Sequence, residues 1–166
     1  FADATSESGI GTYGPMAWGD WDGDGFPDYL EYGGVWHNEG DGTFTLEAVV
    51  SIGTGGFGDL DNDGDLDLFG FIYDAAAYRN EDGEFTPVED AFSPSGIVQH
   101  YGSSAADFDG DGILDIFYGA YEGAGYEPDV LYLGHGDGTF YHHWTEPPAG
   151  PYEPYTKPGR GVTSCD

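Results

Sequence analysis

The chain has very few basic residues. Three lysine and arginine residues stand against 32 acids, which gives a formal net charge of −29 over 166 residues. Such a charge repels phosphate groups, so nucleic acids and anionic membranes are unfavourable partners. No apolar run is long enough to predict membrane insertion. The single cysteine, Cys165, excludes an internal disulfide and leaves either a small inner-strand residue or an intermolecular bridge.

The acids are concentrated in three nine-residue segments of one pattern, at residues 20–28, 59–67 and 107–115. Four carboxylates so close together repel one another unless a cation lies among them, and oxygen ligands at this density favour calcium. Positions one, three, five and nine supply carboxylates, whereas position seven varies, as expected if only its carbonyl binds the ion. The predicted ligands of three Ca²⁺ sites are Asp20, Asp22, Asp24, Phe26 and Asp28; Asp59, Asp61, Asp63, Asp65 and Asp67; and Asp107, Asp109, Asp111, Ile113 and Asp115.

Two further positions in the acidic segments support this interpretation. Position six is always glycine (Gly25, Gly64 and Gly112), which suits a turn with positive φ. Position nine lies within an apolar run at Asp67 and Asp115, where an unpaired carboxylate is costly to bury. Coordination of a cation would remove that cost.

A helix–loop–helix calcium site opens with the same residues, and Glu31 even occupies its twelfth position in the first segment. The surrounding sequence argues against it. The twelfth positions of the other segments are Gly70 and Tyr118, and Pro15 and Pro27 leave little room for an entering helix. Short runs of aromatic and β-branched residues follow each segment instead, and these predict strands.

A second motif recurs in the same phase. An Asp-Gly turn precedes Phe44, Phe85 and Phe140, which predicts a hairpin in each repeat. Each repeat thus contains four strands, with the acidic segment between the first two and the Asp-Gly turn between the last two. The acidic segments start 59 − 20 = 39 and 107 − 59 = 48 residues apart, close to the length of a four-stranded propeller blade.

The predicted fold is therefore all-β: propeller blades of four antiparallel strands with calcium loops, forming an incomplete propeller or a fragment of a larger one. We assign residues 1–10 to the outer strand of a preceding blade, and 11–50, 51–96 and 97–150 to three blades. Residues 151–166 are assigned to a connector and the inner strand of a following blade. Open sheet edges invite pairing, so we expect the remaining blades of a longer chain, or neighbouring copies, to complete them.

The paired motifs resemble the FG-GAP and VCBS repeats of integrin-α-like β-propellers. The resemblance rests on Asp-x-Asp-x-Asp-Gly-x-x-Asp after small residues, alternating with Asn-x-Gly-Asp-Gly-Thr-Phe, and it covers nearly the whole chain. It implies calcium in the hairpin loop between the first two strands of each blade. It also implies the range of uses known for such propellers, which are adhesion modules, lectins and scaffolds attached to enzymes.

Three functions follow as expectations. The first is a calcium-stabilised recognition or adhesion module that binds glycan or protein, located outside the cell or on its surface, where calcium is plentiful. The second is a structural extracellular scaffold or fibre-forming subunit. The third is an accessory domain of a secreted polysaccharide-active enzyme. Tyrosines in glycine- and proline-rich stretches are candidate ligand contacts: Tyr121, Tyr126, Tyr152 and Tyr155.

No catalytic residue is predicted. His100, His142 and His143 are candidates for acid–base groups, but neighbouring side chains on a strand face opposite ways, so His142 and His143 share a site only across a bulge. The sequence contains no nucleophile elbow, phosphate-binding loop or soft-metal cluster. We therefore expect a binding module and not an enzyme.

Overall fold

The computed structural model describes residues 8, 16–71, 75–93, 100–120 and 129–145. Except for Ser8, the segments assigned to neighbouring blades, residues 1–10 and 151–166, lie outside the described residues, as does Cys165. Among the described residues, no helix has the length and apolar character needed to cross a membrane.

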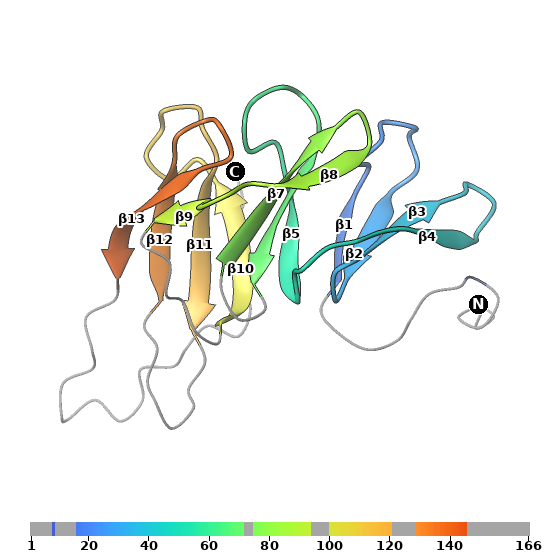
Figure 1. Cartoon of the computed structure of the whole chain (residues 1–166), viewed down its shortest axis with the longest axis horizontal. Coiled ribbons are helices and arrows are strands. Elements are labelled where there is room, and N and C mark those ends of the chain that lie inside the picture. Colours follow the sequence, from blue (N-terminus) through green and yellow to red (C-terminus); the bar gives the residue numbers. More distant parts are fainter. Residues whose placement is uncertain (1–7, 9–15, 72–74, 94–99, 121–128, 146–166) are drawn as a thin grey trace.

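The described residues form three sheets, each of which contains four consecutive antiparallel strands (Figure 1). The prediction of an all-β chain built from four-stranded blades is confirmed. The first blade contains β1 (Met16–Gly19), β2 (Asp28–Glu31), β3 (Gly34–Asn38) and β4 (Phe44–Val49); the second contains β5 (Thr54–Gly58), β6 (Asp67–Phe71), β7 (Ala75–Glu81) and β8 (Glu84–Pro87); the third contains β10 (His100–Ala106), β11 (Asp115–Ala120), β12 (Val130–Gly134) and β13 (Phe140–Thr145).

The three blades share one register. The residue before each acidic loop pairs with the ninth residue of that loop: Gly19 with Asp28, Gly58 with Asp67, and Ala106 with Asp115. Equivalent positions can therefore be compared directly between the blades.

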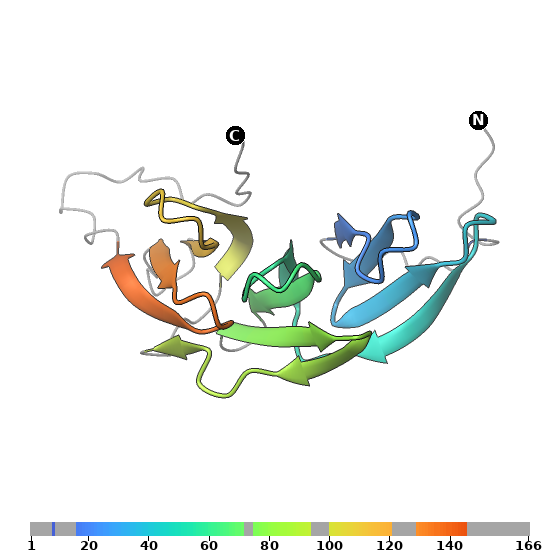
Figure 2. The same cartoon turned by 90° about the horizontal axis from the view of Figure 1, so that it is seen from above.

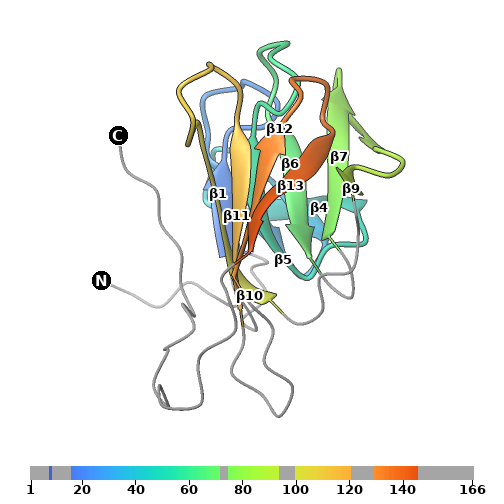
Figure 3. The same cartoon turned by 90° about the vertical axis from the view of Figure 1, so that its left-hand side faces the viewer.

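The blades lie side by side along an arc, with their first strands innermost (Figure 2). Contacts between β1 and β5, and between β5 and β10, join the blades on the inner side. A Cβ atom added to Gly19 would lie 2.8 Å from Cγ of Phe57, so the small residue predicted for the inner strand is needed there for close approach. The acidic loops of all three blades lie along one edge of the assembly (Figures 1 and 3).

Each blade has two apolar faces. We call the face toward the preceding blade the leading face and the face toward the following blade the trailing face. The leading-face positions are Trp18, Tyr29, Trp36 and Phe44 in the first blade, Phe57, Leu68, Tyr78 and Phe85 in the second, and Ala105, Ile116, Tyr132 and Phe140 in the third. The trailing-face positions include Trp21, Leu30 and Val35, then Leu60, Phe69 and Ala77, then Phe108, Phe117 and Leu131.

The hydrophobic core consists of two clusters, one between each pair of neighbouring blades. Between the first and second blades, the ring of Trp21 packs 5.3 Å from that of Phe85. Between the second and third blades, the hydroxyl of buried Tyr118 donates a hydrogen bond to the carbonyl of Gly70 (3.1 Å). Burial of these large side chains is the main apolar contribution to stability, and it depends on the packing of one blade on the next.

Two features were not anticipated from the sequence. Strand β9 (Phe92–Ser93) pairs in parallel with β13, so the chain after the second blade adds a fifth strand to the third sheet. The outer strand pairs also contain bulges. Glu47 is the extra residue between the partners of Val35 and Trp36, and His143 is the extra residue between the partners of Leu131 and Tyr132.

Candidate metal centres

Each acidic loop is a tight turn stabilised by its own side chains. Position six has the expected left-handed backbone, with φ of 92° at Gly25, 103° at Gly64 and 89° at Gly112. Within the loops, carboxylates accept hydrogen bonds from backbone amides two to five residues further along. In the third loop, for example, Asp107 accepts bonds from Gly110 and Gly112 (2.7 and 2.9 Å). The loops are therefore ordered by local hydrogen bonds.

The ninth-position aspartates Asp28, Asp67 and Asp115 are buried, with at most 1% of each residue exposed. Both carboxylate oxygens of each accept a backbone hydrogen bond. One donor is the second residue of the loop, as in Leu60 to Asp67 (2.8 Å), and the other lies at the end of the third strand, as in Asn80 to Asp67 (2.8 Å). The same two bonds recur in the other blades: Trp21 and Asn38 to Asp28, and Phe108 and Gly134 to Asp115.

The two backbone hydrogen bonds offset part of the cost of burying each carboxylate, which the sequence analysis assigned to a cation alone. Burial nevertheless dominates over the hydrogen bonds, because removal from water raises the pKa of all three carboxyls, and that of Asp67 reaches about 6. Repulsion from neighbouring loop acids acts in the same direction, for example from Asp61 and Asp63 on Asp67. The charged form of each ninth-position aspartate thus remains under-stabilised by the protein alone.

The remaining acids bring further oxygens to the same place. In the second and third loops, positions one, three and nine each contribute one oxygen to a group whose members lie within 4.8 Å of one another: Asp59, Asp61 and Asp67, and Asp107, Asp109 and Asp115. In the first loop, Asp20, Asp22 and Asp24 form one such group. Two oxygens that share a calcium ion at about 2.4 Å lie no more than about 4.8 Å apart, so the spacing fits this ion.

Two of these oxygens have no hydrogen-bond partner within the described part of the chain. They are Oδ1 of Asp20, at position one of the first loop, and Oδ1 of Asp61, at position three of the second, and both are shielded from solvent. A buried acceptor without a donor is costly, and a cation would satisfy it. The fifth-position residues Asp63 and Asp111 are not in the groups above. The side chain of Asp65, predicted to contribute only its carbonyl, is exposed.

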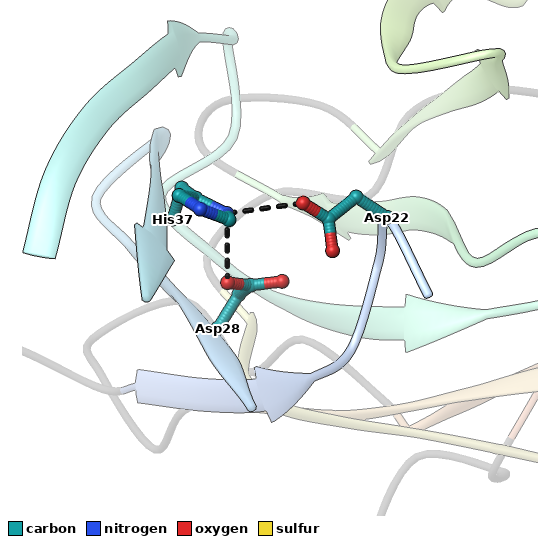
Figure 4. Close-up of side chains that lie close together, drawn as sticks. All are labelled: Asp22, Asp28 and His37. Atoms are coloured by element: carbon teal, nitrogen blue, oxygen red, sulfur yellow. Dashed lines mark ion pairs between the residues drawn. The ribbon is translucent and has the colours of Figure 1, made fainter. Parts of the chain in front are cut away.

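The sequence analysis missed a histidine beside the first loop. Nδ1 of His37, in β3, lies 3.0 Å from Oδ2 of Asp22 and 3.5 Å from Oδ1 of Asp28 (Figure 4). These three residues form a fourth group of metal-ligating type. The imidazole therefore lies where it can either pair with the carboxylates or join them around a cation.

Arginine occupies the equivalent position in the second blade. Nε of Arg79 lies 3.6 Å from Oδ2 of Asp61, and Nη2 donates a hydrogen bond to the carbonyl of Asp137 in the third blade (3.0 Å). The equivalent residue in the third blade is Leu133, which carries no charge. Three loops with similar backbones therefore have three different electrostatic surroundings. Alignment of the hairpins on Asn38 and Asn80 would have revealed the shared position.

An open groove lies between the second blade and the Asp-Gly turn of the third, with a volume of about 360 Å³. It is lined by Arg79, Glu81, Thr86, Pro87, Val88, Glu89 and Thr139. A volume of this size is at the lower end for small-ligand sites. The tyrosines predicted to contact a ligand, Tyr121, Tyr126, Tyr152 and Tyr155, lie outside the described residues.

The strand that carries His142 and His143 is not the regular strand that the sequence argument against a shared site assumed. His143 is the extra residue of a bulge, so side chains do not alternate strictly between the two faces at this point. The ring of His142 packs edge-on against buried Tyr132, with centroids 5.8 Å apart, while His143 is exposed. A bulge also occurs at Glu47 in the first blade, so the irregularity recurs between outer strands and is not specific to the histidines.

The raised pKa of Asp67 predicts a pH dependence of the metal-free protein. The native state binds this proton near pH 6, whereas the unfolded chain binds it near 3.8, so the free energy of unfolding should rise as pH falls through this window. Each pH unit between the two values contributes about 1.4 kcal/mol. Urea unfolding in chelator at several pH values should show this component in the wild type and not in Asp67→Asn.

The matched control is Asp65→Asn, which makes the same charge change at an exposed position of the same loop. Asp65→Asn should retain the pH dependence of the free energy of unfolding that is due to Asp67. Both variants remove one negative charge from the loop, so the general repulsion among the acids falls equally in each. Identical pH profiles for the two variants would show that Asp67 is not the group responsible.

Residues 59–118, which extend from the second acidic loop into β11, match the model of the FG-GAP-like repeat. A search among curated proteins gave no match. The first blade, outside the matched range, has the same pairing of Gly19 with Asp28 and the same two hydrogen bonds to its ninth-position aspartate. The resemblance inferred from the acidic segments and Asp-Gly turns is confirmed for residues 59–118, which match an FG-GAP-like repeat.

Proposed function

We propose that the chain is a calcium-stabilised propeller module that recognises a glycan or a protein outside the cell. The observation that supports calcium is the convergence of acidic oxygens in all three loops. Two acidic oxygens, Oδ1 of Asp20 and Oδ1 of Asp61, are buried without a hydrogen-bond donor among the described residues. Oxygen-only groups of this kind match the preference of a hard cation, and their flexible loops suit calcium better than magnesium.

The residues that would hold the ions are the acids at positions one, three and nine of the second and third loops and at positions one, three and five of the first. The remaining acids of the pattern and the carbonyls of Phe26, Asp65 and Ile113 would complete the sets. A bound cation would supply positive charge beside the buried ninth-position carboxylates. The chain itself orients those carboxylates through two backbone amides each, so the loop and the end of the third strand are already held together. Ion binding would then add electrostatic stabilisation to a preformed arrangement.

Recognition is supported by the family and by the surface. Propellers with such repeats serve as adhesion modules and lectins, and the acidic loops share one edge of the arc, where ordered loops can present contacts (Figure 1). The groove beside Arg79 offers polar groups and aliphatic surface to a small ligand. Its two glutamates favour a neutral or cationic group over an anion.

A structural scaffold is the second candidate, and one observation favours it. Large apolar side chains are exposed on the faces of the first and third blades that no other described blade covers, including Trp18 at 53% and Phe108 at 48%. Exposed apolar side chains of this size are typical of surfaces that bind another protein. Assembly through these faces would be compatible with calcium binding at the loops.

Calcium removal should strongly destabilise the protein. Binding at one hundred times the dissociation constant stabilises the native state by about 2.7 kcal/mol per site, and three sites are available. Differential scanning calorimetry should therefore show a melting temperature that falls by many degrees in chelator, is restored by calcium and is only weakly restored by magnesium. An unchanged melting temperature, with no metal found by elemental analysis, would contradict the calcium proposal.

The three sites should differ in affinity because their neighbouring charges differ. Replacing Arg79 with the third-blade residue, as Arg79→Leu, should tighten one of the three sites about three- to fivefold, since a partly exposed pair is worth about 0.7–1 kcal/mol. Isothermal titration with calcium would measure this change. Arg79→Lys keeps the positive charge and serves as the control, so equal affinities for the two variants would contradict the electrostatic explanation.

A glycan array probed with the calcium-loaded protein tests the recognition part. Saturable binding to a defined set of glycans, lost in chelator, is the expected result for a lectin-type module. Binding to a protein would instead leave the array blank while surface proteins of cells still retain the module in a calcium-dependent way. Failure of both assays with correctly folded, calcium-loaded protein would refute recognition and leave the scaffold function.

A further inference from the structure

The acids of the first loop are grouped differently from those of the other two. In the second and third loops, the buried ninth-position aspartate forms a group with positions one and three of the same loop. In the first loop, the ninth-position Asp28 is grouped instead with Asp22 and with His37 of β3. Asp22 also belongs to the all-carboxylate group with Asp20 and Asp24, so the first loop has two overlapping groups that share one residue.

The spacing within the group of Asp22, Asp28 and His37 fits a small transition-metal ion. Nδ1 of His37 lies 3.0 Å from Oδ2 of Asp22 and 3.5 Å from Oδ1 of Asp28 (Figure 4). Two ligand atoms of a tetrahedral zinc site, each about 2.1 Å from the metal, lie about 3.4 Å apart. The two measured distances lie on either side of this value.

Two carboxylates beside Nδ1 attract positive charge to this point, and either a proton on the ring or a metal ion can supply it. Nδ1 is shielded from solvent and makes no hydrogen bond with any described residue. Its distance from Asp22 is short enough for such a bond, so the ring axis at Nδ1 points to one side of that oxygen. A proton on Nδ1 is therefore poorly placed, whereas a metal ion on the ring axis lies beside the line that joins its ligands.

One of the three ligands is already fixed by the fold, and the other two are accessible. Asp28 is buried, and its carboxylate accepts hydrogen bonds from the amides of Trp21 and Asn38 (3.2 and 2.7 Å). The ring of His37 packs edge-on against that of Trp21, with centroids 6.4 Å apart. The side chains of Asp22 and His37 are 25% and 23% exposed, so an ion has a path to them from solvent.

We propose that Asp22, Asp28 and His37 form a site for a divalent transition metal of the kind that binds imidazole, such as Zn²⁺. Calcium takes oxygen ligands, whereas imidazole suits zinc and its first-row neighbours. Three protein ligands leave a fourth position open to water or to a donor atom of a bound molecule. The residues equivalent to His37 are Arg79 and Leu133, and neither coordinates metals, so this site is specific to the first blade.

Asp22 links this site to the calcium proposal without making one depend on the other. It is also a predicted calcium ligand of the first loop, and two cations so close together repel each other. Zinc should therefore weaken calcium binding at one of the three loops and leave the other two unchanged. The imidazole nitrogen, which calcium does not require, is what distinguishes the zinc site.

Isothermal titration of the chelator-treated 166-residue chain with ZnCl₂ tests the site, with magnesium in excess to occupy weak oxygen sites. His37→Gln removes the nitrogen ligand. His143→Gln is the matched control, because His143 is exposed in β13 and belongs to none of the metal-ligating groups of the described residues. His37→Gln should bind zinc at least about tenfold more weakly than the wild type, a loss typical even of an outer-shell partner. His143→Gln should keep the wild-type affinity, and equal affinities in all three proteins would overturn the site.

Long-range ¹H–¹⁵N NMR spectra of the imidazole rings give a second measurement, which does not depend on the folding of any variant. Zinc should shift the ¹⁵N resonance of Nδ1 in one ring of the wild type, and that ring should be absent from the spectrum of His37→Gln. A shift confined to Nε2 or to another histidine would place zinc elsewhere and overturn the site. If His37 is only an ion-pair partner of the carboxylates, zinc leaves its Nδ1 resonance unchanged, which would also overturn it.

Calcium titration of the same samples separates this proposal from the calcium proposal. Zinc-loaded wild type should retain two calcium sites and bind calcium at the third at least about tenfold more weakly than zinc-free protein, as expected when a ligand is shared. Calcium binding at three loops with no zinc at His37 refutes only the transition-metal site. Zinc bound at Nδ1 of His37 in a protein that binds no calcium supports this site and refutes only the calcium proposal.

Discussion

The blades depend on one interaction, the buried carboxylate at the ninth position of each acidic loop. Asp28, Asp67 and Asp115 each accept one amide hydrogen bond from the loop and one from the end of the third strand. The two bonds join three segments that are separated in sequence, namely the loop, the second strand and the third. They hold the loop over the sheet. The cost is a charge held away from water, which raises the pKa of each carboxyl.

Fold and metal chemistry are therefore linked at the same atoms. A neutral residue at the ninth position would remove the burial cost, but it would also remove an acceptor for one of the two amides. The carboxylate satisfies both amides and keeps lone pairs toward the remaining acids of the loop. The neighbouring residue on the third strand differs between the blades: His37 in the first, the cationic Arg79 in the second and the uncharged Leu133 in the third. The three blades therefore share one backbone arrangement but differ in the charge of the residue beside the acidic loop.

Local patterns made most of the fold predictable. Four strands per repeat, the acidic loop between the first two and the Asp-Gly turn between the last two are encoded within short stretches, and the structure has each of them. The missing features are contacts between distant residues. The amide of Asn80 is 13 residues from Asp67, and His37 approaches Asp22 only because β3 returns beside the loop. The bulges at Glu47 and His143 and the parallel pairing of β9 depend on the packing of whole blades, which no local pattern reports.

The blades also differ in the size of the side chains at their interfaces. On the inner strand the leading-face residue changes from Trp18 to Phe57 to Ala105. Phe57 fits because Gly19 opposite leaves room for its ring, whereas the small Ala105 lies near Gly58 with the side chain of Leu114 filling the space. Each interface is thus adjusted as a pair, and exchange of the blades would create a clash at one junction and a cavity at another. A repeated backbone with individually fitted interfaces therefore favours the native order of the blades.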